Sequence, residues 1–381
     1  MNLLAAAIMP LRLHHPDGIT PVIMGDGAIS SVLPELEDWL ARRTAFLVTT
    51  PRVHALHGDR LDVLRRAASK WVILEVEEGE GAKSIESAER LWNEMLAAGG
   101  KRDSRVLALG GGSVGDLAGF TAGCFLRGVE FVQIPTTLLA QVDAAIGGKT
   151  GVDLPGGKNT VGLFHHPTMV VGDTGVLSTL PREELRSGLV EVIKMAALLD
   201  PDLLGLVEEQ LDRLLEGDAE ALGPVVAAAA AAKIAVVERD PTELGERRLL
   251  NFGHTLGHAI ESACGYMGLR HGEAVGYGIL FALRLARSRG LKATAAGRLR
   301  ALILRLGLPP LPALDPEELM AGMARDKKAR ESGLVWVLPR SVGDGLMEGG
   351  TMEGVMTDGI AAGEVHAELR SFLRDPFHAL V

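Results

Sequence analysis

The sequence has few of the features that mark secreted or membrane-bound proteins. It contains two cysteines in 381 residues, Cys124 and Cys264, which is too few for a disulfide framework. Both lie in apolar helical sequence, so we expect buried, reduced thiols. The apolar segment 3–9 is too short to cross a bilayer, and no basic residue precedes it. We therefore expect a cytoplasmic protein with no membrane partner and no signal peptide.

Positive charge and aromatic side chains are also scarce. There are 39 Lys and Arg residues against 49 Asp and Glu residues, which gives a net charge of −10, and no basic block stands out. This balance argues against a nucleic-acid partner. Aromatic residues make up only 4% of a chain that is 47% hydrophobic, so Leu, Ala and Val must build the core. The length predicts about two domains.

The pattern of apolar residues changes near residue 180. Before it, expected strands alternate with expected helices, which predicts an α/β fold with a Rossmann-like parallel sheet and helices on both faces. After Pro181 helical patterns dominate, including 202–215, 219–238 and 254–264. We expect a nucleotide-binding α/β domain at 1–180 and an all-helical domain at 181–381, in which 334–338 is the one segment that favours a short strand.

A glycine-rich turn lies at the centre of the first domain. Residues 110–116 read GGGSVGD, follow an apolar strand at 106–109 and precede a helix expected at 117–125. A turn of this kind exposes backbone N–H groups to a phosphate, although a tight strand-to-helix turn is the alternative in a chain with 47 glycines. The acidic residue expected about 20 positions later is missing, because Glu130 is a poor candidate. Lys149 and Lys158 follow in glycine-rich sequence, where we expect flexible loops that contact phosphate.

The helical half contains a set of potential metal ligands. Glu191 and Lys194 are three positions apart and share a helix face, where a surface ion pair is the alternative. His254 and His258 are four positions apart, and His271 lies at another helix start. One carboxylate with two or three histidines is typical of a catalytic zinc site. Spacing alone selects His254 and His258 as the ligand pair.

Several basic residues surround these motifs in the sequence. Arg247 and Lys233 lie before His254, while Lys327 and Lys328 come later and have a solvated loop as their alternative interpretation. Together with Arg127, Lys149 and Lys158, they are suited to a substrate that carries phosphate and carboxylate groups.

These segments together resemble the 3-dehydroquinate synthase family. The resemblance rests on GGGSVGDLAGF, RGVEFVQIPTTLLAQVDAAIGGKTGVDLPGGKN, TLPREE, GLVEVIK, LLNFGHTLGHAIES and HGEAVGYGI, and it spans about residues 78–328. It implies tightly bound NAD, one divalent metal (Zn²⁺ or Co²⁺) and a homodimer. The implied enzyme is a carbon–oxygen lyase of the shikimate pathway, which leads to chorismate and the aromatic amino acids. It would convert 3-deoxy-D-arabino-heptulosonate 7-phosphate to 3-dehydroquinate and phosphate. The steps would be transient oxidation, phosphate elimination, re-reduction and intramolecular aldol closure.

The resemblance also implies roles for individual residues. Glu191, His254 and His271 would bind the metal, and His258 would contact substrate, which disagrees with the choice made by spacing. The implied catalytic residues are Asp143, Lys149, Lys194, Arg247, Asn251 and His258. Further substrate contacts would be Arg127, Asn159, Lys233 and Lys327. NAD would contact Glu80, Lys83, Gly112, Ser113, Val114, Gly115, Asp116, Thr136, Thr137, Lys149, Lys158, Leu177, Ser178 and Thr179.

Three alternatives stay open at this point. Another sugar phosphate cyclase would share most of these residues. A metal-dependent alcohol or glycerol dehydrogenase would share the two-domain plan but would need no cluster of phosphate-binding cations. A non-enzymatic NAD-binding module would need no metal ligands.

Two residues depart from the family pattern. Thr50 and Glu78 stand where the family often has aspartate, and these positions bear on how the adenosine ribose would be recognised.

Overall fold

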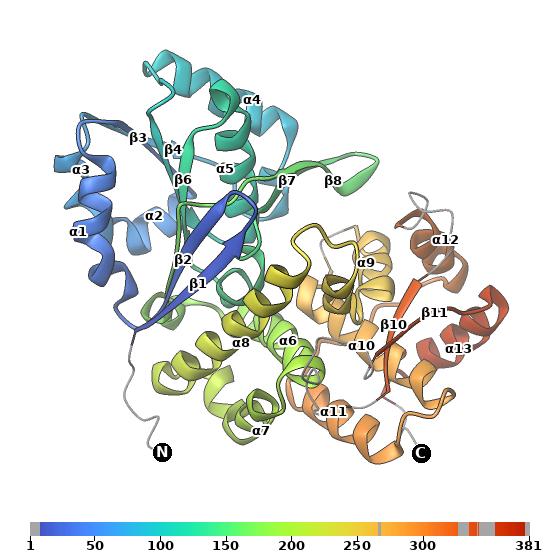
Figure 1. The fold of residues 1–381 in the computed structure, drawn as a ribbon. Coiled ribbons are helices and arrows are strands. Elements are labelled where there is room, and N and C mark those ends of the chain that lie inside the picture. Colours follow the sequence, from blue (N-terminus) through green and yellow to red (C-terminus); the bar gives the residue numbers. More distant parts are fainter. Residues whose placement is uncertain (1–7, 266–267, 327–334, 341, 343–354, 378–381) are drawn as a thin grey trace. The chain divides into compact units, whose positions relative to one another are not determined.

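The computed structural model of the protein describes residues 8–265, 268–326, 335–340, 342 and 355–377 (Figure 1). The chain forms two compact units. The first contains Met1–Pro181 together with Gly217–Glu238, and the second contains Arg182–Glu216 together with Arg239–Val381. The first unit therefore includes a segment from the helical half of the sequence. The division into two domains at residue 180 stays a prediction.

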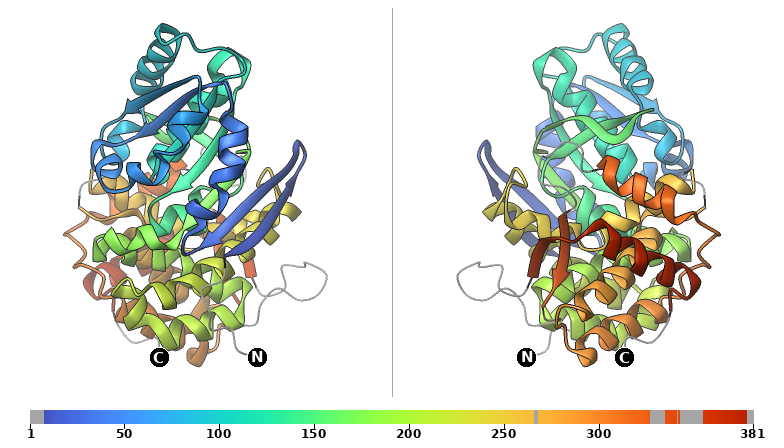
Figure 2. Two further views of the ribbon diagram at one scale, coloured as in Figure 1. Left: turned by 90° about the vertical axis from the view of Figure 1, so that its left-hand side faces the viewer. Right: turned by 90° about the vertical axis from the view of Figure 1, so that its right-hand side faces the viewer.

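A seven-stranded sheet forms the centre of the first unit, in the order β1-β2-β9-β6-β5-β3-β4. The strands are β1 (Met9–His15), β2 (Gly18–Gly25), β3 (Thr44–Thr49), β4 (Lys70–Glu75), β5 (Arg105–Gly110), β6 (Glu130–Pro135) and β9 (Met169–Asp173). Strands β1 and β2 pair antiparallel as a hairpin, drawn in dark blue in Figure 2, and all other neighbours pair parallel. Every residue of β5 is buried, as expected for a central strand with both faces covered.

Helices cover both faces of this sheet, which confirms the predicted α/β class (Figure 1). They are α1 (Ala28–Leu40), α2 (Pro51–His57), α3 (Leu64–Ala67), α4 (Ile85–Ala97) and α5 (Gly112–Cys124). Most of helix α8 (Ala219–Arg239) also belongs to the first unit. Phe46, Val106, Leu117 and Phe131 belong to the core that the sheet forms with α4 and α5. Thr50 begins α2, because its Oγ1 accepts a hydrogen bond from the backbone N–H of Val53 at 3.3 Å.

A second hairpin, β7 (Lys149–Leu154) and β8 (Gly157–Phe164), lies beside α5. Its glycines serve close packing. Gly151 pairs with Gly162, and a Cβ atom on Gly162 would lie 2.3 Å from the carbonyl oxygen of Thr150. A Cβ atom on Gly119 of α5 would lie 2.4 Å from Cγ2 of Thr150. The expectation of flexible loops around Lys149 and Lys158 is therefore wrong, because these glycines let a hairpin form and pack onto a helix.

The second unit is mostly helical. It contains α6 (Arg182–Leu199), α7 (Pro201–Leu215), α9 (His254–Ala263), α10 (His271–Arg287), α11 (Ala293–Arg305), α12 (Pro316–Asp326) and α13 (Ala362–Arg374). It also contains an antiparallel pair, β10 (Val335–Pro339) and β11 (Val355–Gly359). The helical character is confirmed, but "all-helical" needs correction, because β10 and β11 form a two-stranded sheet. The strand expected at 334–338 corresponds to β10, whereas β11 has no apolar run that would indicate a strand.

The two cysteines are more exposed than the sequence predicted. Cys124 is exposed and Cys264 is half-buried, so the expected burial of both thiols is wrong. Cys124 is the last residue of α5.

Among the described residues, α8 alone is long and apolar enough to cross a membrane by length and composition. Most of this helix is buried within the fold, as in the core helix of a globular unit.

Candidate active site

The glycine turn joins β5 to α5 in the first unit. Helix α5 begins at Gly112, five residues before the expected start, so its N-terminal N–H groups lie within the glycine motif itself. A Cβ atom on Gly110 would lie 2.6 Å from Cβ of Val114, and one on Gly115 would lie 2.5 Å from Oε1 of Gln133. Bulkier residues would displace the turn. A free helix N-terminus behind a bare glycine backbone fits a phosphate group.

Charged side chains gather beside this turn. Ser113 Oγ donates to Glu80 Oε2 at 2.7 Å, and Lys83 Nζ lies 2.6 Å from Asp116 Oδ2. Lys158 Nζ lies 3.4 Å from Glu80 Oε1. Burial opposes the charge on Lys83, but Asp116 and Glu80 outweigh it and raise the pKa of the lysine. Five of the expected cofactor contacts therefore lie in one network of opposite charges.

The tip of the β7–β8 hairpin joins the same network. Lys83 Nζ also hydrogen-bonds Asn159 Oδ1. Asn159 has a left-handed backbone conformation with φ 53°, and its N–H donates to Asp153 Oδ1 at 2.7 Å. Lys149 is the first residue of the hairpin, and its side chain is exposed. Asp153 was not identified from the sequence, because a single aspartate between glycines gives no motif.

Other expected contacts of the first unit lie on separate elements. Lys233 of α8 forms an ion pair with Asp143, which lies in the π-helical turn Ala140–Ala144. Thr136 and Thr137 follow β6; the Thr136 N–H donates to Gly110 O at 2.9 Å, and Thr137 Oγ1 accepts from Ala140 N at 3.2 Å. Arg127 is exposed and has φ 69° beyond the end of α5.

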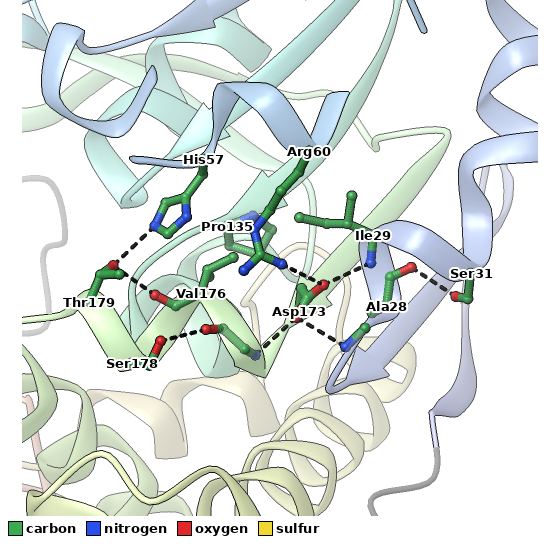
Figure 3. A network of polar contacts seen from close by, with 12 residues as sticks. Ala28, Ile29, Ser31, His57, Arg60, Pro135, Asp173, Val176, Ser178 and Thr179 are labelled. Atoms are coloured by element: carbon green, nitrogen blue, oxygen red, sulfur yellow. Dashed lines mark hydrogen bonds and ion pairs between the residues drawn. The ribbon is translucent and has the colours of Figure 1, made fainter. Parts of the chain in front are cut away.

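Polar contacts also hold the segment Leu177–Thr179, which ends a 3-10 helix (Figure 3). His57 Nε2 lies 3.0 Å from Thr179 Oγ1, and that hydroxyl donates to Val176 O at 2.9 Å. The buried Asp173 carboxylate, one residue before this 3-10 helix, accepts from the backbone N–H of Ile29 at 3.1 Å and of Gly175 at 2.9 Å. The segment is thus fixed to α1 and α2 by residues outside the predicted site.

The potential metal ligands come together within the second unit. Ligand atoms of Glu191, His254 and His271 all lie within 4.8 Å of one another. His254 Nε2 lies 3.7 Å from Glu191 Oε1, and His271 Nε2 lies 3.8 Å from the same oxygen. Glu191 is fully buried in α6, whereas the two histidines begin α9 and α10.

Glycines allow these three helices to approach each other. A Cβ atom on Gly278 of α10 would lie 1.8 Å from the carbonyl oxygen of Gly253, the residue before His254. A Cβ atom on Gly272, the residue after His271, would lie 2.0 Å from the carbonyl oxygen of Ser187 on α6. Ser187 is one helical turn from Glu191. The glycines therefore place both histidines beside the carboxylate.

The chemistry of this cluster fits a divalent cation. His254 Nδ1 lies 3.2 Å from Phe252 O, and His271 Nδ1 lies 3.0 Å from Glu261 Oε2. These oxygens accept hydrogen bonds, so each neutral ring carries its hydrogen on Nδ1 and turns a lone pair on Nε2 towards Glu191. Neither oxygen of Glu191 has a hydrogen bond of good geometry within the described residues, although Lys194 forms an ion pair with Oε2. Three converging acceptors are stabilised by a metal ion.

The pKa values of the two rings follow from their surroundings. Burial, with Lys194 and the other histidines, holds the pKa of His254 well below its usual value, so this ring is neutral and able to bind metal. Burial also opposes charge on His271, but the hydrogen bond to Glu261 and the charges of Glu261 and Glu191 raise the pKa of that ring.

Helical spacing selected His254 and His258 as the metal-ligand pair, and the structure groups these residues differently. Ligand atoms of His258, Glu261 and His271 form a second set within 4.8 Å, but no set found among the described residues contains both His254 and His258. The rings of His254 and His258 meet edge to face, with centroids 5.2 Å apart. Helix periodicity places both side chains on one face, but it does not show that a third helix brings His271 to the cluster.

Further expected site residues belong to the second unit. Lys194 is 1% exposed in its ion pair with Glu191, so the surface ion pair considered from the sequence is excluded. Arg247 is 2% exposed, and its guanidinium donates to Pro241 O at 2.7 Å. Asn251 Nδ2 donates to Glu243 Oε1 at 2.7 Å, a glutamate that sequence reasoning missed. Lys327 lies outside the described residues.

Solved structures with this fold define a class of enzyme. A 2-deoxy-scyllo-inosose synthase, crystallised with carbaglucose-6-phosphate, NAD⁺ and Co²⁺, matches with a TM-score of 0.84 and 25% identity, covering 95% of this chain and 99% of its own. A 2-epi-5-epi-valiolone synthase from Streptomyces hygroscopicus, with NAD⁺ and Zn²⁺ bound, matches with a TM-score of 0.83 and 29% identity, covering 93% and 97%. The fold is thus that of cyclases crystallised with NAD⁺ and a divalent metal.

Sequence comparison gives the family. The family model described as "3-dehydroquinate synthase N-terminal" matches residues 73–187, and the one described as "3-dehydroquinate synthase C-terminal" matches residues 188–329. A 3-dehydroquinate synthase from Pelotomaculum thermopropionicum is 40% identical over 347 residues, covering 90% of this chain and 94% of the relative. The chain belongs to the 3-dehydroquinate synthase family.

Proposed function

We propose that this protein converts 3-deoxy-D-arabino-heptulosonate 7-phosphate to 3-dehydroquinate and inorganic phosphate, as a lyase dependent on NAD and a divalent metal. The proposal is carried by the family match, which is continuous over 73–329 and includes both the glycine turn and the metal cluster. The converging acceptor atoms of Glu191, His254 and His271 support metal dependence. Overall the reaction is redox-neutral, because the product differs from the substrate by loss of phosphoric acid.

In this proposal Glu191, His254 and His271 hold the metal. When both are bound, NAD would take a hydride from a substrate carbon and later return it, while the metal would polarise the hydroxyl group on that carbon. The chain's own residues supply position and charge. The buried ammonium of Lys194 lies beside the cluster, where it offsets negative charge on a bound substrate.

The substrate carries a phosphate and a carboxylate, and each unit offers cations for them. In the second unit we assign Lys194, Arg247, Asn251 and His258 to substrate binding and catalysis. In the first unit we assign Asp143 and Lys149 to catalysis, and Arg127, Asn159 and Lys233 to substrate binding. Guanidinium and ammonium groups form strong charge-assisted hydrogen bonds with both anions, so they can hold the substrate in one orientation.

We assign NAD to the turn at Gly112–Asp116 and the network around it. Pyrophosphate oxygens would accept hydrogen bonds from the α5 N-terminus, while Glu80, Lys83, Lys149 and Lys158 would surround the remaining polar groups. Thr136, Thr137 and Leu177–Thr179 complete the proposed set. A homodimer, a cytoplasmic location and the division into domains at residue 180 belong to the same proposal.

Product stoichiometry tests the function directly. Purified protein is incubated with the heptulosonate phosphate, NAD and Zn²⁺, and phosphate, dehydroquinate and NADH are measured together. We expect equal amounts of phosphate and dehydroquinate with no net NADH. Phosphate release with a different cyclic product would assign another cyclase activity. NADH that accumulates in proportion to an alcohol substrate would assign a dehydrogenase instead.

A further inference from the structure

The His271 ring lies between two carboxylates. Its Nε2 atom is 3.8 Å from Glu191 Oε1, and its Nδ1 atom is 3.0 Å from Glu261 Oε2. Glu261 is 4% exposed and projects from α9, one turn after His258. An acidic side chain this deeply buried needs a partner that stabilises it, and the His271 N–H is one.

This contact determines which nitrogen of His271 is available to a metal. An ionised carboxylate has no hydrogen to donate, so the hydrogen between the two side chains belongs to His271 Nδ1. The lone pair of the neutral ring is then on Nε2, on the side of Glu191 and His254. A ring that was free to rotate would present either nitrogen and would bind metal less often in the right orientation.

The two histidines are held in different ways. His254 donates from Nδ1 to the carbonyl oxygen of Phe252, at 3.2 Å, so the backbone beside it fixes that ring. His271 depends on a side chain from a different helix, Glu261, for the equivalent hydrogen bond. A side-chain substitution can therefore release His271 without changing any metal ligand.

We propose that Glu261 is a positioning residue for the metal centre, which holds His271 with Nε2 directed at the metal. This inference rests on the proposed metal-dependent function. Ligand atoms of Glu261, His258 and His271 also lie within 4.8 Å of one another, so Glu261 is itself a candidate metal ligand. The hydrogen bond argues against that, because Oε2 already accepts the Nδ1 hydrogen, and Nε2 of His271 is directed at Glu191.

The test measures metal affinity and does not depend on catalysis. Metal-free wild-type protein and the variants Glu261→Ala, Glu261→Asp and Glu261→Gln are titrated with Zn²⁺ alone against a chromophoric chelator. We expect Glu261→Ala to bind Zn²⁺ ~10–100-fold more weakly, as is typical when an outer hydrogen-bond partner is lost. Glu261→Asp keeps the charge but is one methylene shorter, so it should resemble Glu261→Ala. Glu261→Gln keeps an acceptor oxygen at the same reach and should recover part of the affinity.

Glu273 supplies a matched control. It is 2% exposed and belongs to the same helix start as His271, but its oxygens accept from Arg270 N and from Arg186, each at 2.9 Å. Glu273→Gln should lower thermal stability and leave the affinity of the folded protein for Zn²⁺ unchanged. A similar loss of affinity in Glu273→Gln would show that any disturbance of the helix start is sufficient, and it would overturn the proposal.

A second measurement covers the case in which Glu261→Ala fails to fold. Co²⁺ bound to wild type and to Glu261→Gln is compared by visible absorption, which reports ligand geometry. We expect a changed Co²⁺ spectrum with stoichiometric binding. Unchanged spectrum and affinity in Glu261→Gln and Glu261→Asp would refute positioning by Glu261. Complete loss of metal, as in Glu191→Ala, would make Glu261 a ligand instead. None of these results depends on which substrate the enzyme uses, so failure of the proposed function is recognised separately.

Discussion

The two units each contain a polar cluster, but the clusters differ in how their charges are balanced. Beside the glycine turn, Lys83 and Lys158 pair with Asp116 and Glu80, so cations and anions alternate. In the second unit, Nε2 atoms of His254 and His271 face a fully buried oxygen of Glu191. The first arrangement compensates its own charge, whereas the second gathers acceptors that a metal ion would stabilise. Substitutions that break the first cluster should therefore lower stability, whereas substitutions within the second should lower metal content.

The largest effect is expected at the metal ligands. Glu191→Ala and His271→Ala each leave a site with two ligands, so both should purify nearly metal-free and lose more than ~100-fold in turnover. His258→Ala should retain zinc and turn over slowly. Elemental analysis of variants purified identically, with folding checked by circular dichroism, measures the difference. Loss of zinc in His258→Ala, with zinc kept in His271→Ala, would restore the pair chosen by helical spacing.

Removing one cation from each unit should have the next largest effect. Arg247→Ala in the second unit and Lys149→Ala in the first should each lower kcat/KM roughly 10- to 100-fold, because a charged contact with substrate is lost. Arg298→Ala is the control, since Arg298 pairs with Glu208 at 2.7 Å and its side chain is 42% exposed. Steady-state kinetics at saturating NAD and Zn²⁺ measure the effect. Wild-type kcat/KM in both variants would mean that the proposed substrate contacts are wrong.

The smallest effect tests charge balance within the first unit. The Lys83 side chain is 4% exposed and its partner Asp116 is 21% exposed, so Lys83→Met should leave a poorly solvated carboxylate and cost ~2 kcal/mol in the free energy of unfolding. The Lys158 side chain is 24% exposed and pairs with the more exposed Glu80, so Lys158→Met should cost less than ~1 kcal/mol. Urea unfolding without ligands compares them. Equal costs would show that burial does not distinguish the two lysines.

Much of the fold could be predicted because its elements have strong local signals. The predicted strand 106–109 lies within β5, and the helix predicted at 219–238 is α8, which ends one residue later. The β7–β8 hairpin was missed, because glycines that normally indicate loops here serve contact between Gly151 and Gly162. Only the packing partner distinguishes these two uses of glycine.

The candidate site was harder to predict from local sequence patterns, because its residues come from segments distant in sequence. Spacing placed His254 and His258 together, but the approach of α10 to α9 and α6 depends on Gly272 and Gly278, whose neighbours are distant in sequence. The resemblance named His271, and the structure places it beside Glu191. Glu243 and Glu261 are single acidic residues in helical or irregular sequence, so no pattern identifies them before their partners Asn251 and His271 are known.

The packing of the β7–β8 hairpin against α5 has a consequence for protein engineering. Gly119 and Gly123 of α5 leave no room for Cβ atoms beneath Thr150 and Leu163, so helix and hairpin have matching surfaces. A hairpin with larger side chains at these contacts would clash with this helix. We therefore expect that α5 and the hairpin, residues 112–164, must be exchanged together; this segment also carries Lys149, Lys158 and Asn159.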